Sequence, residues 1–184
     1  MNEKKSDNKL MREFAGCSLG AYTILYERYN NRILNFVVRS FKMDFDYAEE
    51  IVQQVFIKMF ENKYTYKTHF QFSTWLYTIA RNKTIDVLRV IKRETVLESA
   101  EKATAQDNPS AIIESKEKSK LILEAIGTLS ANQREVLIMR YKLGLSFQEI
   151  AEITSIKINT LKSHAKRGLE KLEAKLKEID YDFA

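Results

Sequence analysis

The sequence predicts an all-α protein made of two small helical domains joined by a flexible linker, the second of them a helix-turn-helix domain. Gly and Pro, which often end helices, number five and one among 184 residues. Long stretches repeat apolar residues every three or four positions, the spacing of one helix face. The pattern lapses over residues 94–118, which hold six acids, three lysines and the sole proline. We therefore expect a first domain at 1–93, a linker at 94–118 and a second domain at 119–184.

The composition favours a binding protein of the cytoplasm. A net charge of +5 suits an anionic partner such as nucleic acid. Cys17 is the single cysteine, so no intrachain disulfide can form, which suits a reducing compartment. No apolar run is long enough for membrane insertion, and the charged start lacks the apolar core of a signal peptide. His69 has no second ligand at metal spacing, so we expect no metal, no cofactor and no enzymatic activity.

Two helices are expected before the central helix of the first domain. Residues 1–13 are polar and are expected to be a frayed start. An amphipathic pattern then runs from Ser18 to about Phe41. Asp46 and Glu49 form a capping-box pair, with Asp46 as N-cap, which predicts the start of a second helix.

The central helix is expected from Ser73, as its N-cap, to about Arg93. On a helical wheel its apolar residues fall in an arc about 120° wide, which suits a stripe that faces the core. This stripe consists of Leu76, Ile79, Ala80, Val87, Val90 and Ile91. The opposite arc holds Trp75, Thr78, Arg81, Asn82, Asp86, Arg89, Lys92 and Arg93.

Two interpretations of this polar arc stay open. It is either a solvated face with Trp75 packed under the loop 61–72, or a surface for nucleic acid. On such a surface cations hold phosphates while an aromatic ring stacks on an unpaired base. The loop itself, ENKYTYKTHFQF from residue 61, has the same ambiguity. Its rings and lysines either contact an unpaired strand or pin the loop to the core.

Capping signals divide the second domain into helices. One capping box pairs Ser130 with Gln133, and another pairs Ser146 with Glu149. Gly144 lies between them and is expected to end the first of these helices.

A short helix, a three-residue turn at 154–156 and a longer helix from about Ile158 have helix-turn-helix spacing. The outward positions of the last helix are Asn159, Lys162, Ser163, Lys166 and Arg167. Such a helix fits the major groove, where amide and cationic side chains pair with base edges. Alternatively, the cations only grip phosphates, which positions a protein without specifying a sequence.

The motifs in both halves resemble those of one protein family. DYAEEIVQQVFIKMF and STWLYTIARNKTIDVLR resemble the second conserved region of bacterial sigma factors. LSANQREVLIMRYKLGLSFQEIAEITSIKINTLKSHAKRGLEKL resembles the fourth region. Over residues 15–93 and 119–173 the chain thus resembles an extracytoplasmic-function (ECF) sigma factor. The resemblance implies that it binds core RNA polymerase and directs promoter-specific transcription initiation. It also implies an anti-sigma factor as partner and a linker that runs toward the RNA exit path.

The resemblance also implies roles for individual residues. Those that would dock on the clamp helices of the largest polymerase subunit are Asp46, Glu50, Gln53, Gln54 and Phe56. Those that would engage and open the minus-ten promoter element are Trp75, Arg81, Asn82, Asp86 and Arg89. Those that would read the minus-thirty-five element are Asn159, Lys162, Ser163, Lys166 and Arg167.

Three positions depart from the family pattern. Ser155 occupies the turn of the helix-turn-helix, where the family often has Gly, so we expect a distorted turn. Asn159 opens the sequence Asn-Thr-Leu-Lys where Gly-Thr-Val-Lys is usual, which would alter the sequence that is read. His164 replaces a basic residue, and its charge would depend on pH.

Three other functions fit the sequence less well. A response-regulator output domain needs a preceding α/β receiver, and the first half has no strand pattern. A helical nuclease needs a carboxylate cluster, a His pair or a Gly-rich phosphate loop. An adaptor that binds only proteins would not need Lys162, Lys166 and Arg167 on one exposed face.

Overall fold

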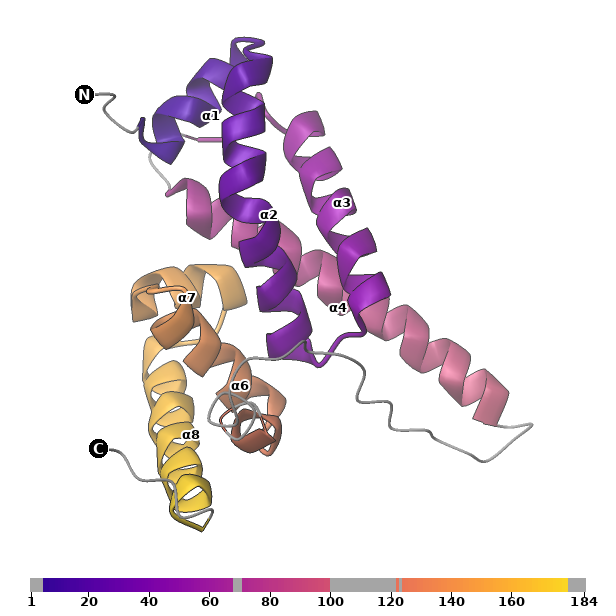
Figure 1. Cartoon of the computed structure of the whole chain (residues 1–184), viewed down its shortest axis with the longest axis vertical. Helices are drawn as coiled ribbons and strands as arrows, with labels where there is room; N and C mark the ends of the chain where they lie inside the picture. The colour runs from indigo at the N-terminus through magenta and orange to yellow at the C-terminus, as the bar shows by residue number, and fades with distance from the viewer. Residues whose placement is uncertain (1–4, 68–70, 100–121, 123, 179–184) are drawn as a thin grey trace.

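The computed structural model describes residues 5–67, 71–99, 122 and 124–178. These residues are helical or lie in turns and loops, which confirms the predicted all-α class (Figure 1). The elements in order are α1 (Asp7–Ala15), α2 (Leu19–Phe41), α3 (Phe45–Glu61), α4 (Phe72–Ser99), α6 (Ala131–Leu137), η1 (Ile138–Lys142), α7 (Phe147–Thr154) and α8 (Ile158–Glu178).

A helix occupies residues 7–15, so the expectation of a frayed start is wrong for this part of the chain, whereas residues 1–4 lie outside the described residues. The Ser6 hydroxyl caps α1 by accepting from the backbone N–H of Lys9. Leu10, Met11 and Phe14 are buried in the core. The i, i+4 spacing of Leu10 and Phe14 was the signal in the sequence. It was too short to stand out, because α1 has little more than two turns.

Helices α2 and α3 form the body of the first half beside α1 (Figure 1). Ser18 caps α2, which ends at Phe41 as predicted. Helix α3 starts earlier than predicted, because its N-cap is Asp44. The Asp44 carboxylate accepts from the N–H of Asp46, so Asp46 lies in the first turn and is not the cap.

Helix α4 crosses behind α2 and α3, and its last turns extend beyond them (Figure 1). It begins at Phe72, one residue before the expected cap, so Ser73 lies inside the first turn. It continues past Arg93 to Ser99. The first residues of the expected linker are therefore helical, and the part from 100 to 118 lies outside the described residues.

The second half has the predicted helix-turn-helix. Both capping boxes, Ser130 with Gln133 and Ser146 with Glu149, are present. Helix α6 widens into the π-helical turn η1, and Gly144 then takes a positive φ of 74°. This conformation suits a residue without a Cβ.

The two halves pack against each other. Helix α4 contacts α7, and α2 contacts α6 and η1 (Figure 1). Arg134 on α6 is buried, and its Nε donates to the backbone carbonyl of Ser40 at 2.9 Å. Ser40 lies at the end of α2, where the helix dipole is negative and favours a cation. Burial lowers the pKa of Arg134 from its usual value.

Candidate nucleic-acid and polymerase interfaces

Helix α8 presents its predicted DNA residues to solvent as one stripe. All five are exposed: Asn159, Lys162, Ser163, Lys166 and Arg167. The Ser163 hydroxyl donates to the Asn159 carbonyl, and Arg167 Nε donates to the Ser163 carbonyl. The inner face of α8 packs through buried Leu161 and Ala165. The helix is thus held by its apolar side while its polar side is open to a duplex.

The turn before α8 is regular, so the expected distortion is absent. Ser155 adopts the left-handed conformation with φ 58° and ψ 25°. Its N–H donates to the Ala151 carbonyl at 2.8 Å, which closes the C-terminus of α7. The Thr154 hydroxyl accepts from the N–H of Ile156. These bonds compensate a left-handed serine, whose cost is roughly 1–2 kcal/mol.

Helix α4 presents its predicted DNA residues less uniformly. Asn82, Asp86 and Arg89 are exposed, and Arg89 Nη1 lies 3.3 Å from the Asp86 carboxylate. Arg81 is instead turned toward the second half. Its Nε donates to Glu135 Oε1 of α6 at 2.7 Å, with 16% and 7% of the two side chains exposed. In this arrangement Arg81 is engaged by a carboxylate and does not face solvent with its neighbours.

Trp75 packs against the start of α4 and the loop before it. Its ring centroid lies 5.2 Å from that of Tyr66 and 6.1 Å from that of Phe72. The indole is half-buried, whereas Tyr66 and Phe72 are buried. Trp75 therefore contacts the loop and keeps part of its ring at the surface.

The aromatic residues of the loop 61–72 divide between core and surface. Tyr66 is buried, while Tyr64 is 71% exposed. Lys63 Nζ lies 4.5 Å from the ring centre of Phe60 and 5.1 Å from that of Tyr64, in cation–π contact. His69 lies outside the described residues. The loop thus has both pinned rings and an exposed ring beside a cation.

The predicted polymerase residues lie along one side of α3, with one exception. Asp46, Glu50 and Gln53 are exposed, and Gln54 Nε2 donates to Glu50 Oε1 at 3.2 Å. Phe56 is only 2% exposed. Its ring packs 4.7 Å from that of Tyr26, so any contribution of Phe56 to this surface is indirect.

The sequence analysis missed the apolar part of this surface. Ile57 is 57% exposed and lies seven residues after Glu50, two helical turns along the same side of α3. Tyr26 and Phe60 are exposed nearby on α2 and α3. Ile57 falls outside the inward stripe of α3, which is a signal that the sequence does contain. Exposed apolar groups gathered on one surface indicate a protein-binding site.

The described residues contain no group of three or more His, Cys, Asp or Glu side chains placed to hold a metal ion. In the same part of the chain, no helix combines the length and apolar character needed to cross a membrane.

Two family models match the chain, one in each half. The model described as Sigma-70 region 2 matches residues 25–94, and the model described as Sigma-70, region 4 matches residues 119–172. The first match includes α3 and the greater part of α4, and the second includes the helix-turn-helix. Helix α1 precedes both matches.

Similar proteins cover most of the chain. The ECF RNA polymerase sigma factor SigW of Bacillus subtilis is 34% identical in an alignment of 143 residues that covers 72% of this chain and 76% of SigW. The ECF RNA polymerase sigma-E factor of Haemophilus influenzae is 25% identical over 97% of this chain and 100% of its own.

Solved structures share the arrangement of helices. The sigma factor RpoE of Bartonella quintana, in complex with the anti-sigma factor NepR, is 25% identical with a TM-score of 0.71. The match covers 85% of this chain and 96% of RpoE. CnrH, solved with the cytosolic domain of CnrY, has the same fold at 21% identity and a TM-score of 0.68.

Proposed function

This chain belongs to the ECF sigma factors of RNA polymerase, and we propose how its surfaces divide the work of promoter recognition. As a member of this family it directs promoter-specific transcription initiation. The observation that carries the proposal is the pair of polar helix faces, one on α4 and one on α8. They lie in separate halves, so one chain can contact two DNA elements.

The α8 stripe is proposed to read the minus-thirty-five element. Asn159 and Lys162 lie in the first turns of α8, where side chains of a recognition helix reach base edges. An Asn amide can pair with adenine, and a Lys ammonium with guanine. Lys166 and Arg167 lie further along and would hold phosphates, while Ser163 would contribute a hydroxyl donor.

The α4 face is proposed to engage and open the minus-ten element. Opening exposes bases that have left the stack, at a cost of a few kcal/mol. Trp75 has a partly exposed ring that could stack on such a base, which recovers roughly 1–3 kcal/mol. Asn82, Asp86 and Arg89 would line the strand, and Arg81 would join them once it leaves Glu135.

The surface of α3 is proposed as the docking site for core polymerase. Its exposed polar residues Asp46, Glu50 and Gln53, together with Gln54, lie along the same side of the helix as the exposed side chain of Ile57. Protein interfaces combine apolar and polar groups. Buried Phe56 would support Tyr26 from below.

The two halves must separate for both elements to be bound at once. The difference between positions minus thirty-five and minus ten is about 25 base pairs. At roughly 3.4 Å per base pair, this spacing corresponds to about 85 Å of duplex. The longest helix, α4, is only about 40 Å long. Residues 94–99 belong to α4, so only residues 100–118 of the expected linker could extend, over at most roughly 60–70 Å. We propose that this length, added to the breadth of the two halves themselves, lets the halves part.

The family also suggests a further protein partner for this chain and the cellular compartment in which it acts. RpoE of Bartonella quintana was solved with an anti-sigma factor, and we propose that this chain has one too. We also propose that the linker follows the RNA exit path, that the chain acts in the cytoplasm, and that its activity is binding without catalysis.

Reconstitution tests this proposal directly. Core RNA polymerase with the purified chain should start transcription from a defined set of promoters, seen by sequencing RNA 5′ ends. The starts should share two sequence elements at constant spacing. Random starts, or starts that core polymerase makes equally well alone, would refute the assignment.

A further inference from the structure

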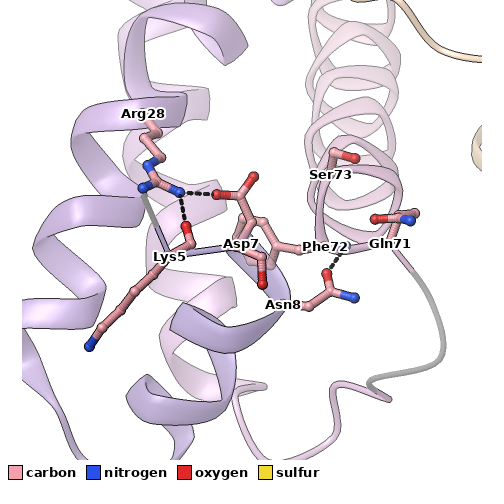
Figure 2. A pocket seen from close by; sticks show the side chains of 8 residues that line it. Lys5, Asp7, Asn8, Arg28, Gln71, Phe72 and Ser73 are labelled. Carbon is pink, nitrogen blue, oxygen red and sulfur yellow. Dashed lines mark hydrogen bonds and ion pairs between the residues drawn. The ribbon is translucent and has the colours of Figure 1, made fainter. Parts of the chain in front are cut away.

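We propose that Asn8 on α1 is a positioning residue for promoter opening, because one side-chain oxygen binds both Tyr66 and the first residue of α4. Asn8 Oδ1 accepts from the Tyr66 hydroxyl at 3.0 Å and from the backbone N–H of Phe72 at 2.9 Å. Figure 2 shows the Asn8 amide directed at the start of α4. This oxygen therefore links the Tyr66 ring to the start of the helix that carries Trp75.

The bond to Phe72 also completes the start of α4. The first N–H groups of a helix have no partner within the helix and need an acceptor from elsewhere. Ser73, the cap expected from the sequence, lies inside the first turn. Asn8 therefore supplies from another helix an acceptor for the first N–H of α4.

Helix α1 is a firm support for this oxygen. The Asp7 carboxylate accepts from Arg28 on α2 (Figure 2). It also accepts from the Tyr29 hydroxyl on the same helix. Three apolar residues of α1 are buried beneath it. Asn8 is thus held by the residue before it and by the core, and it does not depend on the loop for its place.

The rings that Asn8 positions are those around Trp75. Tyr66 and Phe72 both lie against the indole, at 5.2 Å and 6.1 Å between ring centres. If the Asn8 oxygen is lost, the Tyr66 hydroxyl and the Phe72 N–H lose an acceptor, and the ring pair loosens. Helix α1 lies outside both family matches.

The inference rests on the proposed role of α4 and Trp75, and its test uses the full chain in holoenzyme with core polymerase. Asn8→Leu removes the acceptor at similar volume, whereas Asn8→Asp keeps an acceptor oxygen. A carboxylate at a helix N-terminus is also favourable. Tyr66→Phe removes one donor and keeps the ring. Lys9→Ala, an exposed change on the same helix, is the matched control.

Open complexes are measured by permanganate footprinting on duplex promoters, beside transcription from a pre-melted template. Loss of two hydrogen bonds in Asn8→Leu should lower opening roughly tenfold, and Tyr66→Phe should lower it roughly threefold. Asn8→Asp and Lys9→Ala should open promoters as the parent does. Transcription from the pre-melted template should be preserved in all four. Trp75 is the only tryptophan of this chain, so acrylamide quenching is measured on the free chain. Quenching should rise in Asn8→Leu, rise less in Tyr66→Phe, and stay unchanged in Asn8→Asp and Lys9→Ala.

Normal opening by Asn8→Leu would overturn the inference. So would equal loss in Asn8→Asp, or equal loss on the pre-melted template, because either result would indicate general destabilisation. If Asn8→Leu does not fold, Tyr66→Phe decides, and normal opening by that variant overturns the inference. Trp75→Ala in the same assay distinguishes a failure of the proposed role of α4 from a failure of the role of Asn8. Normal opening by Trp75→Ala refutes the proposed role of α4, whereas a defect there with normal Asn8 variants refutes only the role of Asn8.

Discussion

Helices α4 and α8 both carry five predicted DNA residues, but they present them differently. On α8 all five are exposed, from Asn159 to Arg167. On α4 Arg81 is paired with Glu135 of the other half, and Trp75 is partly covered by rings of its own half. The α8 face is therefore exposed in this structure. We propose that the α4 face becomes complete only when the second half moves away.

The difference follows from where each helix lies. Helix α4 packs on α2 and α3 and also meets α7, so its first half, where Trp75 and Arg81 lie, is largely covered. Helix α8 lies at the edge of the molecule and packs on α6 and α7 (Figure 1). Neighbouring helices can control access to the polar face of a central helix such as α4. The polar face of a peripheral helix such as α8 has no such cover.

The largest expected effect comes from breaking the contact between the halves. Glu135→Ala leaves Arg81 without its carboxylate, and a hydrogen bond between charged groups contributes about 1.5–3 kcal/mol. The packed arrangement should weaken by that amount, and a single-stranded minus-ten oligonucleotide should bind more tightly in the absence of polymerase. Fluorescence anisotropy measures this binding.

Glu178→Ala is the matched control, because it removes a carboxylate from an exposed ion pair with Lys175. Exposed pairs contribute little, so binding should not change. If Glu135→Ala also left oligonucleotide binding unchanged, the contact between the halves would not limit access to α4.

Trp75→Ala tests the covered part of the α4 face. Loss of one stacked base should cost promoter opening roughly 1–3 kcal/mol. Closed-complex binding and the melting temperature should stay nearly the same, and a pre-melted template should be affected less than a duplex. Permanganate footprinting and thermal unfolding distinguish the outcomes. A drop of several degrees in melting temperature with normal opening would make Trp75 a core residue.

Asn159→Ala tests the exposed face of α8. It should cost about 1–3 kcal/mol on the preferred minus-thirty-five sequence and relax specificity at one position. Because α8 is exposed already, this cost should be the same in the Glu135→Ala background. Binding to a library of duplexes measures both quantities. A cost that depends on Glu135 would remove the distinction between the two helices.

The smallest effect is expected from Arg167→Ala. Arg167 lies late in the α8 stripe and is proposed to hold phosphate, so all sequences should weaken alike. The slope of log affinity against log salt should fall by about one. A specificity profile identical to that of Asn159→Ala would show that the two positions do not have different roles.

The sequence predicted what local signals determine. Ser130 and Ser146 cap helices as expected, because a cap depends on residues three positions away. The exposed stripe of α8 followed from helical periodicity. Asp44 was missed as the cap of α3, since Asp46 offered an equally good signal two residues later.

The features that the sequence did not predict depend on contacts between distant residues. Arg81 lies on α4 and Glu135 lies on α6, and only the packing of the two halves brings these residues together. Asn8 has no distinguishing signal in the sequence, because its partners lie at residues 66 and 72.

The separation of the two halves is the central claim, and a distance across the molecule tests it most directly. Lys9 on α1 and Ala174 on α8 are exposed positions for a pair of fluorescent labels, introduced as Lys9→Cys and Ala174→Cys in a Cys17→Ser background. The free protein should show efficient energy transfer between them. In an active complex with polymerase and promoter, transfer should fall as the halves part toward elements about 85 Å away. Unchanged transfer in complexes that still initiate transcription would contradict the account.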